Sequence, residues 1–172
     1  MNRALIFVLL TNLLLSACSR VQTTRPAGQS QSPTDGGVAG PSVAAAAAKV
    51  TDACSLIPVG IAERLVPGAS PPEREQFPRR CTLRNAKSAL GITLDTGPDE
   101  PVKGAEFIPG LAKGGYLERL DPVDRGDVYL TVILGMDDVT NRNLHVEVAG
   151  HDGKDHKDDA IAVARDILAR LH

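Results

Sequence analysis

The chain has 172 residues, a formal net charge of −2 at pH 7 and 3% aromatic residues, with no tryptophan. This charge balance argues against a nucleic-acid partner, because such proteins usually present a basic patch. With so few aromatic residues, a folded core has to be built from aliphatic side chains.

The first 17 residues have the layout of an export signal. Arg3 precedes an apolar stretch over residues 4–15, which is short for a membrane span and matches the apolar region of a secretory signal. The stretch ends in "LSAC", where Ser16 and Ala17 are small enough to let a peptidase approach the backbone, and the thiol of Cys18 can be linked to a diacylglycerol. This pattern resembles a bacterial lipobox. We therefore expect a signal peptide over residues 1–17 and lipidation of Cys18; the alternative is an ordinary cleaved signal with a chance cysteine.

Lipidation of Cys18 predicts where the protein is found. Each buried methylene contributes about 0.8 kcal/mol to membrane binding, so two or three acyl chains, palmitate among them, hold a protein far better than one. We expect a protein anchored in the cell membrane through its lipid, on the extracytoplasmic face.

The segment after Cys18 has the composition of a tether. Residues 19–49 are rich in Pro, Gly, Ser, Thr, Gln and Ala and contain no aromatic residue. Such a segment buries too little apolar surface to offset its ordering entropy, so we expect a disordered tether over residues 18–49. The five alanines from Ala44 to Ala48 favour a helical turn, but they are too few for a stable isolated helix. A single domain is then predicted over residues 50–172.

Cys54 and Cys81 remain once Cys18 is acylated. An even pair of cysteines in an exported domain usually forms a disulfide. The alternative is a metal-binding or catalytic thiol pair, which the sequence disfavours because it has no CxxC spacing and no histidine near either cysteine.

Helices are predicted at both ends of the domain. Over residues 57–68, Pro58 stands in a favourable first-turn position, and Ile57, Ile61 and Leu65 share one face before the chain reaches "PG". At the C-terminus, apolar residues recur at helical spacing after an acidic start that suits the helix dipole. The members of that apolar stripe are Ile161, Ala164, Leu168 and Leu171.

Segments of alternating polarity lie between these helices. They cover residues 79–85, 90–96, 115–121, 127–135 and 144–150, and short turn-rich joints separate several of them. Consecutive strands with short joints favour antiparallel pairing. The prediction is an α+β domain, with an antiparallel sheet of about five strands and an N-terminal and a C-terminal helix packed on one face.

The motifs "DACSLIP", "RRCTL", "IPGLAKGGYL" and "AIAVARDILARL" resemble the actinobacterial surface lipoproteins that are grouped as a domain of unknown function. The resemblance covers most of residues 51–171. It implies an envelope lipoprotein with no known activity and no catalytic residues. Two features depart from the family: Leu83 stands where Trp is usual, and the helix at Pro58 lacks the usual acidic start.

Asp95 lies in "ITLDTG", which looks like the signature of an aspartic protease. That chemistry needs two such aspartates sharing one proton, so a dimer would have to supply the second. Pro98 follows the motif where a small residue is usual. The alternative is a strand that ends in a common Asp-Thr-Gly turn.

Histidines and aspartates gather near the C-terminus. His145, His151 and His156, with Asp152 and Asp155, form the densest group of metal-type ligands in the sequence, and three imidazoles can bind zinc. The same residues fit a solvated loop followed by the acidic start of a helix.

The best candidate for a binding surface is the long Gly- and Pro-rich region over residues 97–115. Apolar residues in a long loop over a sheet can line a cleft. The candidate residues are Phe107, Ile108, Leu111, Lys113 and Tyr116. The alternative is that Phe107 plugs the edge of the core.

These patterns favour a non-catalytic, membrane-tethered binding or interaction module that needs no cofactor. Its ligand would be a wall component, a lipid or another envelope protein. One alternative is an envelope hydrolase that uses Asp95 or a metal bound by the histidine cluster. Another is an accessory subunit of an envelope sensor.

Overall fold

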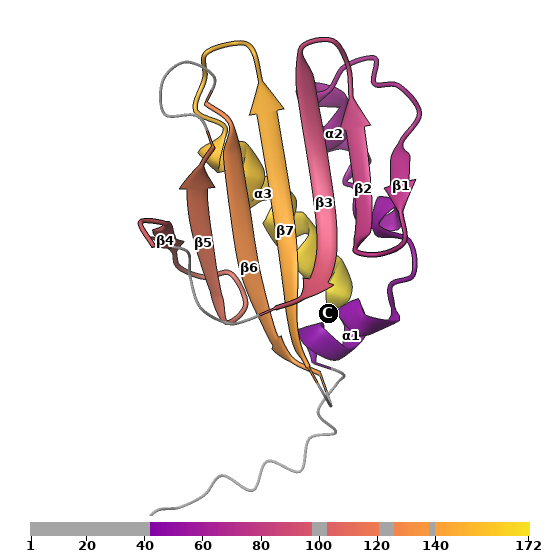
Figure 1. Ribbon diagram of the computed structural model, residues 1–172, viewed down its shortest axis with the longest axis vertical. Coiled ribbons are helices and arrows are strands. Elements are labelled where there is room, and N and C mark those ends of the chain that lie inside the picture. The colour runs from indigo at the N-terminus through magenta and orange to yellow at the C-terminus, as the bar shows by residue number, and fades with distance from the viewer. Residues whose placement is uncertain (1–41, 98–102, 121–125, 138–139) are drawn as a thin grey trace, which may run out of the picture. The chain divides into compact units, whose positions relative to one another are not determined.

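The computed structural model describes residues 42–97, 103–120, 126–137 and 140–172, in which seven strands form one open antiparallel sheet (Figure 1). The strands lie in the order β1-β2-β3-β7-β6-β5-β4. The elements are α1 (Val43–Lys49), the 3-10 helix η1 (Ala53–Leu56), α2 (Val59–Leu65), β1 (Glu73–Glu75), β2 (Arg79–Arg84), β3 (Ser88–Thr96), β4 (Glu106–Ile108), β5 (Gly114–Arg119), β6 (Val128–Met136), β7 (Asn141–Gly150) and α3 (Lys157–Leu171).

The predicted α+β class is confirmed, and each of the five predicted strands is present. The prediction of about five strands is too low, because β1 and β4 add one short strand at each edge of the sheet. Each has three residues, and β1 is exposed along its whole length. Segments of three residues are too short to show a clear alternation of polar and apolar residues, which is the signal that identified the longer strands.

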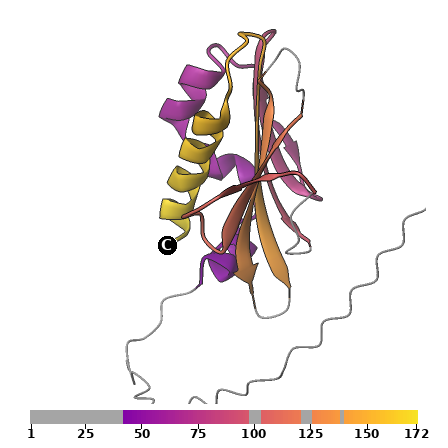
Figure 2. The same cartoon turned by 90° about the vertical axis from the view of Figure 1, so that its left-hand side faces the viewer.

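The helices cover one face of the sheet, as predicted (Figure 2). Most strand residues that point toward the helices are aliphatic, and the predicted stripe of the C-terminal helix is buried against them. The most deeply buried of these side chains are Leu90, Ile92, Leu117, Leu130, Val132, Leu144, Val146 and Ile167. The core is therefore built without aromatic rings.

The predicted N-terminal helix of the domain is present but turned relative to the expectation. Its residues Ala62 and Val66 are buried, whereas Ile61 and Leu65 are only half-buried. Pro58 is the N-cap residue of α2, so the proline stands one position earlier than a first-turn residue. Within α2 itself the buried residue is Ala62, a small side chain.

Helix α1 shows that the folded domain begins before residue 50, so the expectation of a tether up to residue 49 is wrong at its C-terminal end. Ala44 and Ala47 are 1% exposed and belong to the core, and α1 packs against β6, β7 and α3. The Ser42 side chain caps the helix by accepting a hydrogen bond from the Ala45 N–H at 3.2 Å. A helix this short is unstable in isolation, but α1 is stabilised because its small residues Ala44 and Ala47 pack into the core.

The C-terminal end of α1 is held by Arg79 from β2. Its guanidinium donates to the carbonyls of Ala48, at 3.1 Å, and of Val50. Burial lowers the pKa of Arg79 below its usual value, with the charge of Arg142 as a second cause. Cys18, the predicted signal peptide and the predicted tether up to residue 41 lie outside the described residues.

The predicted disulfide between Cys54 and Cys81 is confirmed. It joins η1 to β2, with the two Cα atoms 4.9 Å apart, and Cys81 is fully buried. Asp52 caps η1 by accepting a hydrogen bond from the Cys54 N–H at 2.8 Å. The disulfide therefore attaches the N-terminal helical segment to the sheet.

Replacing both Cys54 and Cys81 by serine should lower the free energy of unfolding. The bond joins residues 27 positions apart, and the chain-entropy relation gives about 3–4 kcal/mol for such a loop. Urea denaturation with and without a reductant measures this difference. The wild type should shift its midpoint on reduction, and the double-serine control should not; equal midpoints for both proteins would contradict the stabilising role.

Candidate functional site

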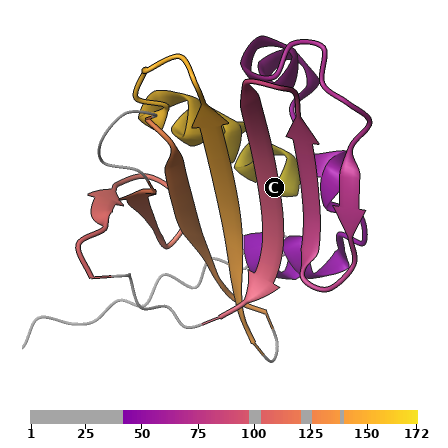
Figure 3. The same cartoon turned by 45° about the horizontal axis from the view of Figure 1, so that its top comes forward.

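The face of the sheet opposite the helices carries the aromatic side chains of the strands and many of their polar ones. Figures 1 and 3 look onto this open face, with the helices behind the strands. One row of paired residues runs across six strands, from the β4 edge toward β2. Its members are Phe107, Tyr116, Thr131, His145, Thr93 and Arg80.

The centre of this face is a hydrogen-bonded chain of three side chains. His145 Nε2 lies 2.9 Å from Asp95 Oδ1, and His145 Nδ1 lies 3.0 Å from Thr131 Oγ1. For an ionised Asp95 and a neutral His145, Nε2 donates to the carboxylate and the Thr131 hydroxyl donates to Nδ1. The result is a linear carboxylate–imidazole–hydroxyl arrangement built from β3, β7 and β6.

The strand register explains why these three residues meet. Thr131 is directly opposite His145, and Asp95 is opposite Asn143, two positions along β7 from His145. Directly opposite and diagonal neighbours on one face are close enough for their side chains to touch. The ring of Tyr129, the diagonal neighbour on β6, stacks on the imidazole with centroids 5.2 Å apart.

Tyr129 is half-buried among negative groups. Burial raises the pKa of its phenol to about 12, with the charges of Asp95 and Glu147 as further causes. The phenol therefore stays protonated at physiological pH and remains a hydrogen-bond donor on the open face.

An ion pair crosses the sheet beside this chain. Arg80 on β2 lies 3.0 Å from Glu147 on β7, and the two side chains meet over Gly91 of the intervening strand β3. A Cβ at Gly91 would lie 3.3 Å from Glu147 Oε2, so a side chain there would press on the pair. Glycine at this position lets charges from two strands reach each other.

Small residues on the same face leave a hollow of ≈280 Å³ next to the ion pair. Ala89, Gly91 and Ala149 lie in it, while Arg80 and Lys87 contribute positive charge. In this hollow a ligand group could approach the backbone of β3 and β7.

The predicted binding region divides between the two faces of the sheet. Phe107 and Tyr116 lie on the open face, with ring centroids 5.6 Å apart, and Phe107 is 57% exposed. Phe107 therefore does not plug the core, which corrects that alternative. Ile108 and Leu111 point the other way and are buried in the core, so including them in a binding surface is wrong.

The remainder of that region is a strand and a turn. Lys113 is exposed and follows Ala112, which has a positive φ of 44°. Residues 98–102, in the predicted loop, lie outside the described residues. The residues that the structure brings together on the open face are thus Phe107, Tyr116, Asp95 and His145, which the sequence had assigned to three different sites.

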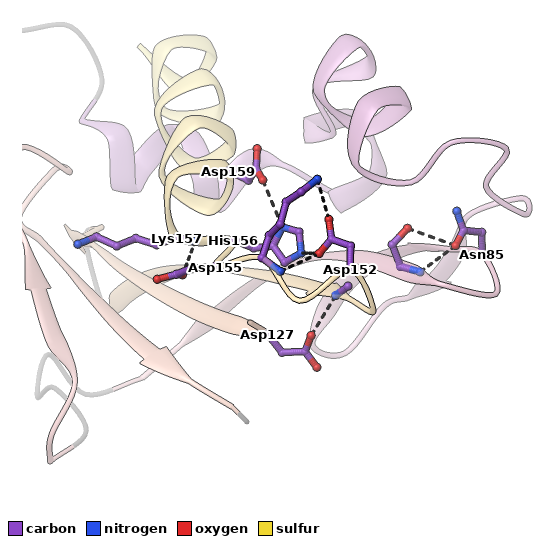
Figure 4. A network of polar contacts seen from close by, with 10 residues as sticks. Asn85, Asp127, Asp152, Asp155, His156, Lys157 and Asp159 are labelled. Atoms are coloured by element: carbon purple, nitrogen blue, oxygen red, sulfur yellow. Dashed lines mark hydrogen bonds and ion pairs between the residues drawn. The ribbon is translucent and has the colours of Figure 1, made fainter. Parts of the chain in front are cut away.

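The predicted histidine cluster is not brought together. His145 is on the open face, whereas His156 precedes α3 and packs against Gly150, five residues further along β7 and about 17 Å away at strand spacing. His156 lies between two carboxylates, 3.2 Å from Asp152 and 3.2 Å from Asp159 (Figure 4). Within the described ranges, no group of three or more His, Cys, Asp or Glu side chains is placed to hold a metal ion.

The other acidic residues at this end stabilise the turn before α3. The pKa of Asp155 is lowered by its hydrogen bond from Arg119 and then by the Lys157 N–H, and the pKa of Asp152 is lowered chiefly by the Lys154 N–H. His151 is exposed. The local contacts of this cluster therefore support the interpretation of a solvated loop and an acidic helix start.

Asp95 does not meet a second aspartate in the described chain. Its carboxylate faces His145, so the proton-sharing pair of an aspartic protease is not formed between described residues. Among the helices that the structure describes, none has the length and apolar character needed to cross a membrane.

Comparison of the chain with protein-family models, with curated proteins and with solved structures finds no match. The function of the open face therefore has to be inferred from its own geometry and chemistry.

Proposed function

We propose that this chain is a lipid-anchored protein on the extracytoplasmic face of the cell membrane, and that its domain is a non-catalytic binding module. The anchor is inferred from the lipobox pattern at Cys18. The disulfide supports export, because such bonds persist in oxidising compartments. The resemblance to actinobacterial surface lipoproteins points to the same place.

The observation that carries the binding role is the location of the aromatic rings. Phe107, Tyr116 and Tyr129 all lie on the open face, while the core is aliphatic. Aromatic side chains usually contribute most when they are buried, and on protein surfaces they are enriched at binding sites. We infer that a ligand, either a wall component, a lipid or an envelope protein, covers this face.

Several polar and charged groups on the open face already contact one another within the domain. Arg80 contacts Glu147, and His145 is held between Asp95 and Thr131. A surface of this kind recognises its partner through aromatic contact and a few oriented polar groups rather than through net charge.

Changing Cys18 to alanine should release the protein from membranes, because no acyl chain can then be attached. Fractionation of cells that express the full chain measures this, with Thr23→Ala as a control that keeps the anchor and the disulfide. Persistent membrane association of the Cys18→Ala variant would contradict acylation as the anchor.

A photo-reactive benzophenone residue at position 107 should form crosslinked adducts in intact cells, because that side chain is exposed on the proposed binding face. Position 59 is the matched control, since Val59 is 69% exposed but starts α2 in the helix layer. Adducts should be several-fold more abundant from position 107. Equal yields from the two positions, or none from either, would contradict a partner on the open face.

A second candidate function is supported by the Asp95–His145–Thr131 chain, namely hydrolysis of an ester. Thr131 Oγ1 would bond to the carbonyl carbon while its proton passes to His145 Nδ1. The leaving alcohol would take that proton, and water would then cleave the acyl-threonine and restore the hydroxyl.

The geometry favours binding over this second candidate. Thr131 is in β6 between β5 and β7, where backbone N–H groups are used in the ladders on either side. Those groups are not available as donors to an oxyanion, and such donors usually supply a large part of the catalysis of acyl transfer.

Purified wild-type protein should therefore show no hydrolysis of activated esters above background. If it does hydrolyse them and the Asp95–His145–Thr131 chain is responsible, Asp95→Asn and Thr131→Val should each reduce the rate by about 10²–10⁴-fold. Thr93→Val, on the same face, is the control. An activity that disappears in Asp95→Asn would overturn the non-catalytic proposal.

A further inference from the structure

One end of the sheet carries two exposed apolar side chains. Phe77, in the turn between β1 and β2, is 93% exposed, and Met136, the last residue of β6, is 62% exposed. The register places both at one end: Arg79 pairs with Leu94, Thr96 with Arg142, and Met136 with Asn141. A single exposed phenyl ring is ordinary on a protein surface, so the position of these residues matters more than their number.

This end of the sheet is also where the described chain begins. Figure 1 shows α1 at the same end as the β1–β2 turn and the end of β6. A hollow of ≈430 Å³ connects the two parts, because Ala48 of α1 lines it together with Phe77 and Arg142. The first described helix, α1, and Phe77 therefore lie at the same end of the domain.

We propose that this end of the domain, with Phe77 inserted, docks on the lipid surface in which the Cys18 anchor is embedded. This inference rests on the proposed lipid anchor. Between Cys18 and Ser42 the chain has 23 residues, and a flexible segment of that length spans roughly 25–30 Å. The domain is thus always within reach of the bilayer.

The charges at this end indicate which lipid property is recognised. Arg79 donates to carbonyls of the α1 end, and Arg142 pairs with Asp137 at 2.5 Å. Arg79 and Arg142 are engaged within the domain, whereas Lys49 of α1 and Lys113, which lies against Gly135 of β6, are exposed. The docking proposed here is the apolar insertion of Phe77, which occurs on zwitterionic phosphatidylcholine; anionic headgroups would add to it through the two lysines.

One phenyl ring gains too little on insertion to hold a soluble protein at a membrane. The lipid anchor makes this weak insertion sufficient. Once the anchor is embedded, contact of Phe77 with the bilayer is intramolecular, at an effective concentration on the order of millimolar. Docking at this end directs the strands away from the bilayer. The open face then remains accessible to an envelope ligand.

The absence of tryptophan from the sequence makes the test direct. The variants Phe77→Trp and Leu120→Trp each contain a single tryptophan. Leu120 is the matched control: it is 51% exposed and follows β5, whose last residue Arg119 pairs with Val128 at the opposite end of β6 from Met136. Met136→Trp provides a second probe at the docking end.

The full lipidated chain is reconstituted into phosphatidylcholine vesicles with or without acyl-brominated lipid, which quenches tryptophan within the bilayer. The emission of Phe77→Trp should be blue-shifted and largely quenched, that of Met136→Trp partly quenched, and that of Leu120→Trp unchanged. Circular dichroism confirms that each variant is folded, and co-sedimentation with vesicles reports on the anchor separately.

Protein that co-sediments while the Phe77→Trp emission is unquenched would overturn the docking and leave the anchor intact. Equal quenching of Phe77→Trp and Leu120→Trp would also overturn it, because the domain would then have no preferred end. Loss of co-sedimentation would overturn the anchor and the docking together.

Discussion

The structure depends on one-sided burial of an antiparallel sheet. Along β3, β6 and β7, alternate residues are aliphatic and fully buried against the helices. Because side chains in a strand point alternately to the two faces, the remaining residues are placed together on the other face. That face stays open since all the described helices lie on one side of the sheet.

This division of the residues has a chemical consequence. The core uses Leu, Ile, Val and Ala, so the aromatic rings and the polar groups are available to the open face. There, cross-strand neighbours engage one another: Tyr129 stacks on His145, Asp95 and Thr131 bond its two nitrogens, and Arg80 reaches Glu147 over Gly91. A face in which the polar groups hold one another in position is pre-organised, and that reduces the entropy lost on binding.

The ends of the domain differ as clearly as its faces. At one end lie α1, whose small residues pack into the core, and the exposed side chains of Phe77 and Met136. At the other end the turn before α3 is held by the contacts of His156 with two carboxylates and by the ion pair of Asp155 with Arg119. With the lipid anchor that we propose, this polarity would place the end with Phe77 near the membrane and leave the open face accessible.

The sequence by itself determined the local features. Alternation in residues 127–135 and 144–150 identified the two faces of β6 and β7, helical spacing identified α3, and counting cysteines identified the bond between Cys54 and Cys81. The strand and helix patterns are local in sequence, and two cysteines allow one pairing. These signals can therefore be interpreted without knowledge of the fold.

Only the tertiary structure decided which strands are neighbours, and with that the site. Asp95 and His145 are 50 residues apart and meet because β3 pairs with β7 rather than with β4. Similarly, Ala44 and Ala47 form a stable helix only because the core receives them, and Phe107 and Ile108 lie on opposite faces only because β4 joins the sheet. Strand order and helix docking result from burial summed over the whole domain, and no local pattern of residues carries that information.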